Sequence, residues 1–132
     1  MADTKKADTT VNITLSSVII DAADPESEGA FWQRLLGGSI TRTPTHHFIQ
    51  APGFPVLVIQ AAPGHAAPHW PDGTSQQLHL DFAVDDLATA DRTAVEAGAS
   101  RLRPTDAVPP DSRKGSRVYA SPAGHPFCLR TV

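Results

Sequence analysis

Three side chains that could take part in acid–base or nucleophilic chemistry lie in the second half of the chain: His79, Asp81 and Cys128. His79 and Asp81 are two residues apart in segment 77–84, where apolar residues occupy every second position. This period of two is typical of a β-strand with one apolar and one polar face. An imidazole and a carboxylate on the same face predict that this strand lines a pocket.

Each of these residues has more than one possible role. His79 could be a metal ligand, a general base or a hydrogen-bond donor to a bound molecule, or a partly buried residue paired with Asp81. Asp81 could orient the imidazole or instead pair with Arg130, and both alternatives stay open. Cys128 beside His79 would form a minimal nucleophile pair, but free cysteines are common in protein cores, so we favour a structural role for Cys128. The candidate catalytic residues are therefore these three, with no catalytic role assigned.

The segment before the central strand is rich in proline and glycine and contains two histidines and a tryptophan. His65 and His69 have the spacing of a helical metal-binding pair, but Pro68 lies between them and makes a helix unfavourable. We predict a solvated loop here. Trp70 could either cover the pocket or pack on the edge of the sheet.

The pattern of strands, helices and breakers occurs twice. In both halves an aspartate is placed to cap a helix: Asp24 in the first, and Asp85 or Asp86 in the second. Helices are predicted from these caps to Gly37 and Gly98. The predicted strands cover 11–22, 39–43, 46–50, 55–60, 77–84, 100–103, 117–120 and 126–132.

These elements predict an internal duplication. Ser17 and His79 are 62 positions apart, and Asp24 and Asp86 have the same separation. The expected fold class is α+β: two tandem βαβββ modules that form a curled mixed sheet around a cavity, with the helices outside. One domain is expected over 11–132, with module one at 11–60, a linker at 61–76 and module two at 77–132. Residues 1–10 are expected to be a disordered tail.

Composition excludes several classes of protein. The 132 residues carry a formal net charge of −3 and lack both a basic stripe and a long apolar run, so neither nucleic acid nor a membrane is an expected partner. The chain has one cysteine, which rules out an internal disulfide and favours the cytoplasm.

Three stretches together resemble the vicinal-oxygen-chelate superfamily of glyoxalase I, bleomycin-resistance proteins and extradiol dioxygenases. The resemblance is strongest to the glyoxalase-like domain branch. The stretches are residues 19–25 with the following Phe31-Trp32 and Leu36-Gly37, residues 78–87 with Ala97-Gly98-Ala99, and residues 121–129. The last stretch departs from the family's usual Asp-Pro-x-Gly-Asn turn, since Ser121 and His125 replace the aspartate and the asparagine.

The resemblance implies four metal-ligand positions, which fall on Ser17, on or near Gln60, on His79 and on Cys128. Of these only His79 is a strong ligand for the oxygen- and nitrogen-bound metals of the family. We therefore predict no metal and no other cofactor.

The resulting expectation is a protein that binds or transforms a small organic molecule in the sheet cavity without the usual divalent metal. Two alternatives stay open: a metal-dependent lyase, isomerase or dioxygenase of the glyoxalase type, and a non-catalytic, drug-sequestering protein of the bleomycin-resistance type. A homodimer is expected because family members often form one. The predicted ligand-binding residues are Ser17, Gln60, Trp70, His79, Asp81 and Cys128.

Overall fold

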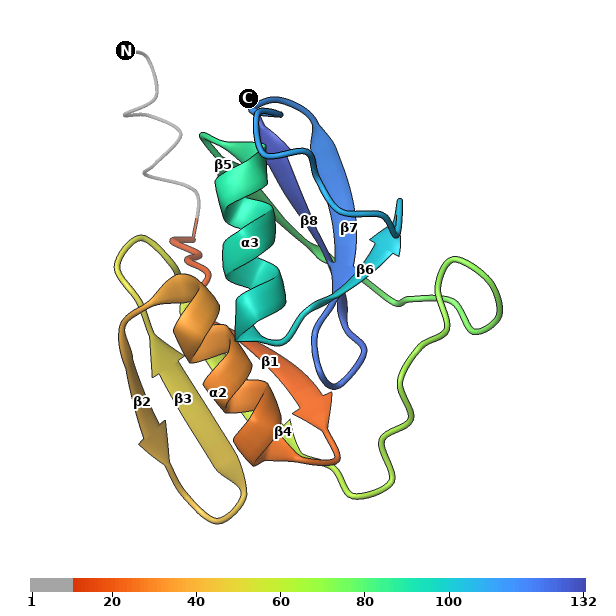
Figure 1. Ribbon diagram of the computed structural model, residues 1–132. Helices are drawn as coiled ribbons and strands as arrows, with labels where there is room; N and C mark the ends of the chain where they lie inside the picture. The colour runs from red at the N-terminus through yellow and green to blue at the C-terminus, as the bar shows by residue number, and fades with distance from the viewer. Residues whose placement is uncertain (1–10) are drawn as a thin grey trace.

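The computed structural model describes residues 11–132, which form two βαβββ modules (Figure 1). Module one contains β1 (Ser17–Ala22), α2 (Pro25–Leu36), β2 (Ser39–Arg42), β3 (His46–Gln50) and β4 (Val56–Ala61). Module two contains β5 (Leu80–Val84), α3 (Leu87–Ala97), β6 (Ser100–Arg103), β7 (Ser116–Ala120) and β8 (Pro126–Thr131). The predicted order of elements is confirmed. The tail predicted over residues 1–10 lies outside the described residues.

The eight strands form two four-stranded mixed sheets, in the orders β1-β4-β3-β2 and β5-β8-β7-β6. In each sheet the first strand of the module runs parallel to the last, and the other pairs are antiparallel. Val18 pairs with Leu57, and at the equivalent place in module two Leu80 pairs with Phe127. The matching registers support the duplication predicted from the sequence.

Aspartate caps begin both helices, as predicted. The side chain of Asp24 accepts hydrogen bonds from the backbone amides of Glu26 and Ser27. Asp86, and not Asp85, caps α3, because its carboxylate accepts from the amide of Thr89. These bonds satisfy amides that have no partner inside the helix.

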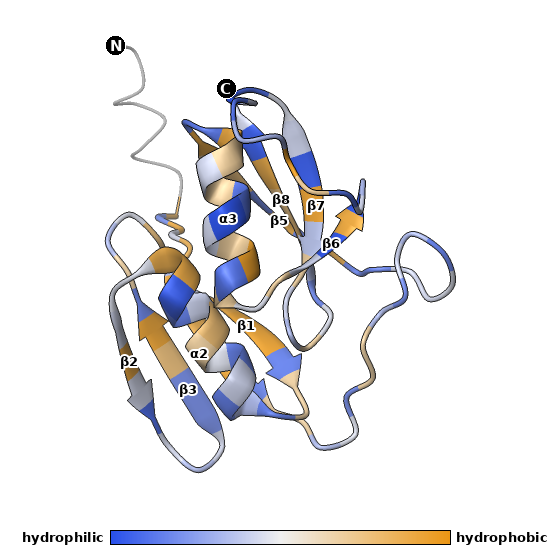
Figure 2. Ribbon diagram, viewed as in Figure 1, coloured by the Kyte–Doolittle hydropathy of each residue, from blue (hydrophilic) through white to orange (hydrophobic). Residues whose placement is uncertain are grey.

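Both helices pack on the same side of the sheets, and α2 and α3 lie next to each other (Figure 1). Apolar residues occur on the strands and helices of both modules (Figure 2). Their buried side chains form one core that both modules share. Its centre is aromatic: the rings of Phe31 and Trp32 on α2 lie 5.7 and 5.3 Å from that of Phe127 on β8. Tyr119 on β7 stacks on Phe127 at 5.5 Å. The described residues contain no helix that is both long and apolar enough to cross a membrane.

Two strands begin several residues later than predicted, and a proline accounts for the later start of β5. The strand predicted over 11–22 begins at Ser17, and the strand predicted over 77–84 begins at Leu80. In module one the amide of Val56 still donates to the carbonyl of Ser16, so Pro55 does not itself remove a hydrogen bond to β1. Pro126 holds the place of Val56 in module two and has no amide hydrogen to donate to β5, so the pairing of β5 ends at Leu80. Consequently Leu78, predicted to face the helices, is 64% exposed.

Two buried carboxylates hold elements together. Asp91 on α3 accepts hydrogen bonds from the Arg101 guanidinium at 3.0 and 2.8 Å and from the Tyr119 hydroxyl at 2.7 Å. The bonds from Arg101 hold the pKa of Asp91 below its usual value, against the opposing effect of burial.

Glu28 on α2, fully buried, accepts from the Trp32 indole at 2.8 Å and from the backbone amide of Ala123 at 2.7 Å. Glu28 thereby connects module one to the turn before β8.

We expect Glu28→Ala to lower the free energy of unfolding by about 2–4 kcal/mol, because it leaves two buried N–H donors without an acceptor. Urea denaturation monitored by far-UV circular dichroism would measure this loss. Glu26→Ala is the matched control, since Glu26 makes only an exposed ion pair with Arg42 and should change stability by less than about 1 kcal/mol. Equal losses in the two variants would contradict a connecting role for Glu28.

Candidate functional site

The three candidate catalytic residues do not assemble into a catalytic group. His79 is exposed and lies one residue before β5, whereas Asp81 is on β5 and pairs in register with Cys128 on β8. Asp81 forms an ion pair with Arg130. Of the two partners considered from the sequence, Arg130 is therefore the one that Asp81 contacts.

Cys128 is a free, half-buried thiol on the face of the second sheet that is turned away from the helices. Burial raises its pKa, the negative charge of Asp81 raises it further, and the Arg130 guanidinium opposes both effects. A raised pKa keeps the thiol protonated at neutral pH, and the protonated form is a poor nucleophile. This environment agrees with the structural role favoured from the sequence.

The four positions implied for metal ligands do not fit a divalent metal. Gln60 pairs with Asp21 in module one. At the equivalent place in module two, Arg130 pairs with Ala83. The counterpart of Gln60 is therefore Arg130 and not Cys128. An arginine engaged with Asp81 is no ligand. Among residues 11–132 no three His, Cys, Asp or Glu side chains gather closely enough to hold a metal ion.

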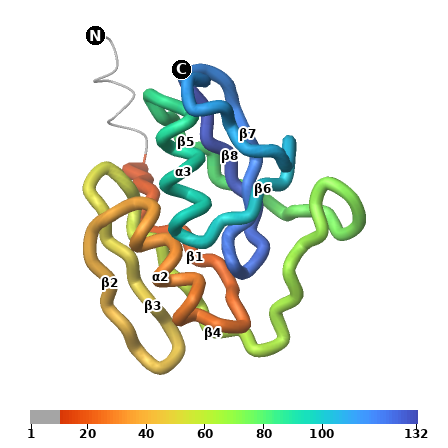
Figure 3. Tube along the Cα trace, in the orientation of Figure 1, coloured from red at the N-terminus to blue at the C-terminus, as the bar shows by residue number. Residues whose placement is uncertain are grey.

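Trp70 lies in the linker between β4 and β5, which extends away from the two sheets (Figure 3). The guanidinium carbon of Arg103 lies 5.7 Å from the centroid of the Trp70 ring, a cation–π distance. Arg103 ends β6, the outer strand of the second sheet, so Trp70 packs at a sheet edge, one of the two alternatives considered for it.

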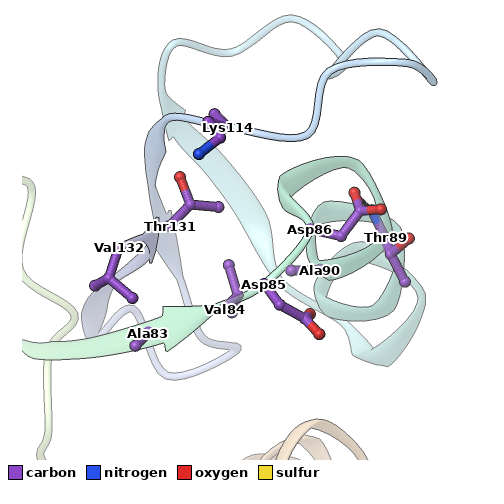
Figure 4. A pocket seen from close by; sticks show the side chains of 9 residues that line it. All are labelled: Ala83, Val84, Asp85, Asp86, Thr89, Ala90, Lys114, Thr131 and Val132. Atoms are coloured by element: carbon purple, nitrogen blue, oxygen red, sulfur yellow. Dashed lines mark hydrogen bonds between the residues drawn. The ribbon is translucent and has the colours of Figure 1, made fainter.

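A cavity of about 620 Å³ lies where β5 leads into α3 (Figure 4). Two of its polar side chains already have partners that belong to the fold. Asp86 caps α3 and lies 3.8 Å from the Arg113 guanidinium, and the Thr131 hydroxyl both accepts from and donates to the backbone of Gly115. We therefore regard this cavity as a surface hollow and not as the functional site.

A second cavity, of about 410 Å³, has a different character, and we call it the linker cavity. It is lined by residues 18–21 of β1, by 65, 66, 68 and 74–78 of the linker and its continuation, and by 125–126 at the start of β8. Val18, Ile20, Leu78 and Pro126 supply apolar wall. The volume is within the range that holds small organic ligands, and apolar walls with few polar groups are typical of such sites.

The polar residues that line the linker cavity include two histidines and a glutamine. Nε2 of His125 donates to the backbone carbonyl of Asp21 at 2.7 Å. His65 stacks on His125 with ring centroids 5.2 Å apart. The Oε1 atom of Gln76 is shielded from solvent and has no hydrogen-bond partner among the described residues. A buried acceptor without a partner is uncommon and costs about 1–3 kcal/mol.

The turn at residues 121–125 fixes one wall of this cavity. The Ser121 hydroxyl accepts from the amide of His125 at 3.1 Å, so the serine closes the turn. At Gly124 the linker comes very close, since an added Cβ would lie 2.4 Å from the Cβ of Ala67. Only glycine allows this approach, which holds the linker against the turn.

Sequence reasoning assigned the site to other residues. The six predicted ligand contacts line neither of the two cavities described above, and their role stays a prediction: Ser17, Gln60, Trp70, His79, Asp81 and Cys128. The prediction from the sequence did not include His125 or Gln76. It assigned His65 to a solvated loop, although His65 is half-buried. The histidine at the asparagine position of the turn was the one available signal.

Comparisons with known proteins agree on one kind of fold. A family model described as the glyoxalase-like domain matches residues 17–130. A search of curated proteins found no significant match. A glyoxalase/bleomycin resistance protein/dioxygenase family enzyme from Burkholderia phytofirmans PsJN is similar at 19% identity and a TM-score of 0.65, with 91% of this chain and 99% of that chain covered. A glyoxalase-related enzyme from Fulvimarina pelagi has 22% identity and a TM-score of 0.63, covering 90% and 88%.

The pKa of Cys128 leads to a labelling experiment. We expect iodoacetamide to modify Cys128 at pH 8 more slowly than a cysteine in an unstructured peptide, because less thiolate is present. Asp81→Asn removes an anion that raises this pKa and should increase the thiolate fraction about two- to fivefold. Arg130→Gln should have the opposite effect.

Asp85→Asn is the matched control, since Asp85 lies beyond the end of β5 and is not among the groups that shift this pKa. Mass spectrometry would follow the labelling. A rate equal to that of the unstructured peptide, unchanged in both variants, would show that the sheet leaves this thiol unperturbed.

Proposed function

The chain belongs to the glyoxalase-like domain family, and from this premise we propose that it binds a small organic molecule in the linker cavity. The observation that carries the proposal is a cavity of about 410 Å³ with a mainly apolar wall, one of whose lining residues, Gln76, has a buried amide oxygen without a partner. A ligand that donates a hydrogen bond would remove the energetic cost of that oxygen, and the apolar wall would supply much of the binding free energy.

Binding is better supported than catalysis. The Cys128 thiol has a raised pKa, Asp81 is engaged with Arg130, and His79 is exposed, so these side chains do not form an activated nucleophile with its base. The donor set at the four family positions likewise gives no support to a metal-dependent lyase, isomerase or dioxygenase. A protein that binds or sequesters its ligand without transforming it is therefore the function that we favour.

Two further expectations are part of the proposal. Self-association as a homodimer is supported by the exposed apolar side chains of Val11, Ile13 and Leu15, which precede β1 and are 72%, 84% and 71% exposed. Sedimentation equilibrium would test it, and a monomer at micromolar concentration would refute it. A cytoplasmic location is supported by the single cysteine, which forms no internal disulfide.

A cavity-filling substitution tests the proposed binding site. Ala66 lines the linker cavity and is itself exposed, so Ala66→Phe should occupy the cavity with little loss of stability. Ligand-observed NMR with a library of small aromatic and aliphatic compounds should detect binders of the unmodified protein whose signals disappear with this variant.

Ala107→Phe adds the same side chain at an exposed position outside the cavity and is expected to leave binding unchanged. Thermal unfolding would establish that both variants are folded. Binders that persist equally in Ala66→Phe would locate the ligand elsewhere, first on the sheet face that carries Asp81 and Cys128.

A further inference from the structure

The residues that line the linker cavity carry little charge. Asp21 is the one among them with a full charge when the histidines are neutral, and neither lysine nor arginine appears among the described residues of its wall. The amide oxygen of Gln76 has no partner. The one strong ring donor of His125, Nε2–H, is already used by the carbonyl of Asp21, which leaves the neutral imidazole with Nδ1 as an acceptor.

No arginine lines the linker cavity, and three arginines of module two have partners elsewhere. The Arg130 guanidinium is bound to Asp81, and that of Arg101 to Asp91. Arg103 stacks over Trp70. Asp21 is therefore the one fully charged residue of the cavity wall, and a cavity with one sign of charge favours ligands of the opposite sign.

The site thus requires a ligand with two features. Its body must be apolar to match Val18, Ile20 and Leu78, and its polar end must donate hydrogen bonds to Gln76 and carry positive charge toward Asp21. The glutamine side chain has three rotatable bonds, so its amide oxygen can turn toward a donor that enters the cavity. A carboxylate or phosphate would instead meet acceptors and a like charge, which is unfavourable.

We infer that the linker cavity selects small apolar molecules that carry an ammonium group. This inference rests on the proposed function, because it specifies the ligand class of the same cavity. It goes further in excluding organic anions, including the carboxylates and phosphates that an arginine- or lysine-lined pocket would hold.

The experiment uses three probes of nearly equal size: benzylamine, benzyl alcohol and benzoate. Protein-observed NMR titrations at neutral pH would measure the affinity of each, with the backbone amides of residues 18–21 and 74–78 as reporters. Benzylamine should bind most tightly, benzyl alcohol more weakly, and benzoate not measurably. If none of the three shifts these amides, the proposed binding site itself fails. If benzoate or benzyl alcohol binds as tightly as benzylamine, the site stands and the ligand class is wrong.

Two variants assign the preference to named groups. Asp21→Asn should lower the affinity for benzylamine about two- to fivefold, since it removes one partly solvated charge. The affinity for benzyl alcohol should stay unchanged. Asp85→Asn is the matched control, with an exposed carboxylate outside this cavity, and should change neither. Gln76→Met, which keeps the length of the side chain, should weaken benzylamine and benzyl alcohol alike without lowering the melting temperature. If Asp21→Asn and Asp85→Asn lower the affinity for benzylamine equally, the preference reflects only the net charge of the protein, and the inference is overturned.

Discussion

The buried carboxylate of Glu28 is the constraint on which the arrangement of the two modules depends. It joins α2 to the backbone of Ala123, and the turn that contains Ala123 then directs His125 toward the carbonyl of Asp21 on β1. The contacts therefore run from module one into the turn of module two and back to module one. Because this chain of contacts includes Asp21 and His125, which line the linker cavity, the packing of the core and the geometry of the cavity depend on each other.

The two modules have kept their architecture and changed their surface chemistry. Asp24 and Asp86 cap equivalent helices, and the parallel strand pairs have equivalent registers. On the sheet faces turned away from the helices, however, Gln60 of module one corresponds to Arg130 of module two. Caps and core positions are tied to folding, whereas solvent-facing strand positions are free to vary, so the fold can persist while these positions change.

The sequence was sufficient to predict the order of elements, both helix caps and the duplication, because these depend on local periodicity and on residues with strong positional preferences. It misplaced the starts of β1 and β5, since the point where their pairing ends depends on partner strands that are distant in sequence, as with Pro126 beside β5. It also missed the linker cavity. A segment such as 61–76 has no periodicity, and the isolation of the Gln76 oxygen is a property of its surroundings, which only the assembled structure reveals.

The two tryptophans occupy different environments, with a practical consequence for spectroscopy. The Trp32 indole is buried beside Glu28 in the shared core, whereas Trp70 is half-buried in the linker and held by Arg103 at the far edge of the second sheet. Release of the linker would alter the emission of Trp70 and leave Trp32 in place, while loss of the core would alter both. Intrinsic fluorescence of this chain thus contains two separable signals, one for local opening over the cavity and one for global unfolding.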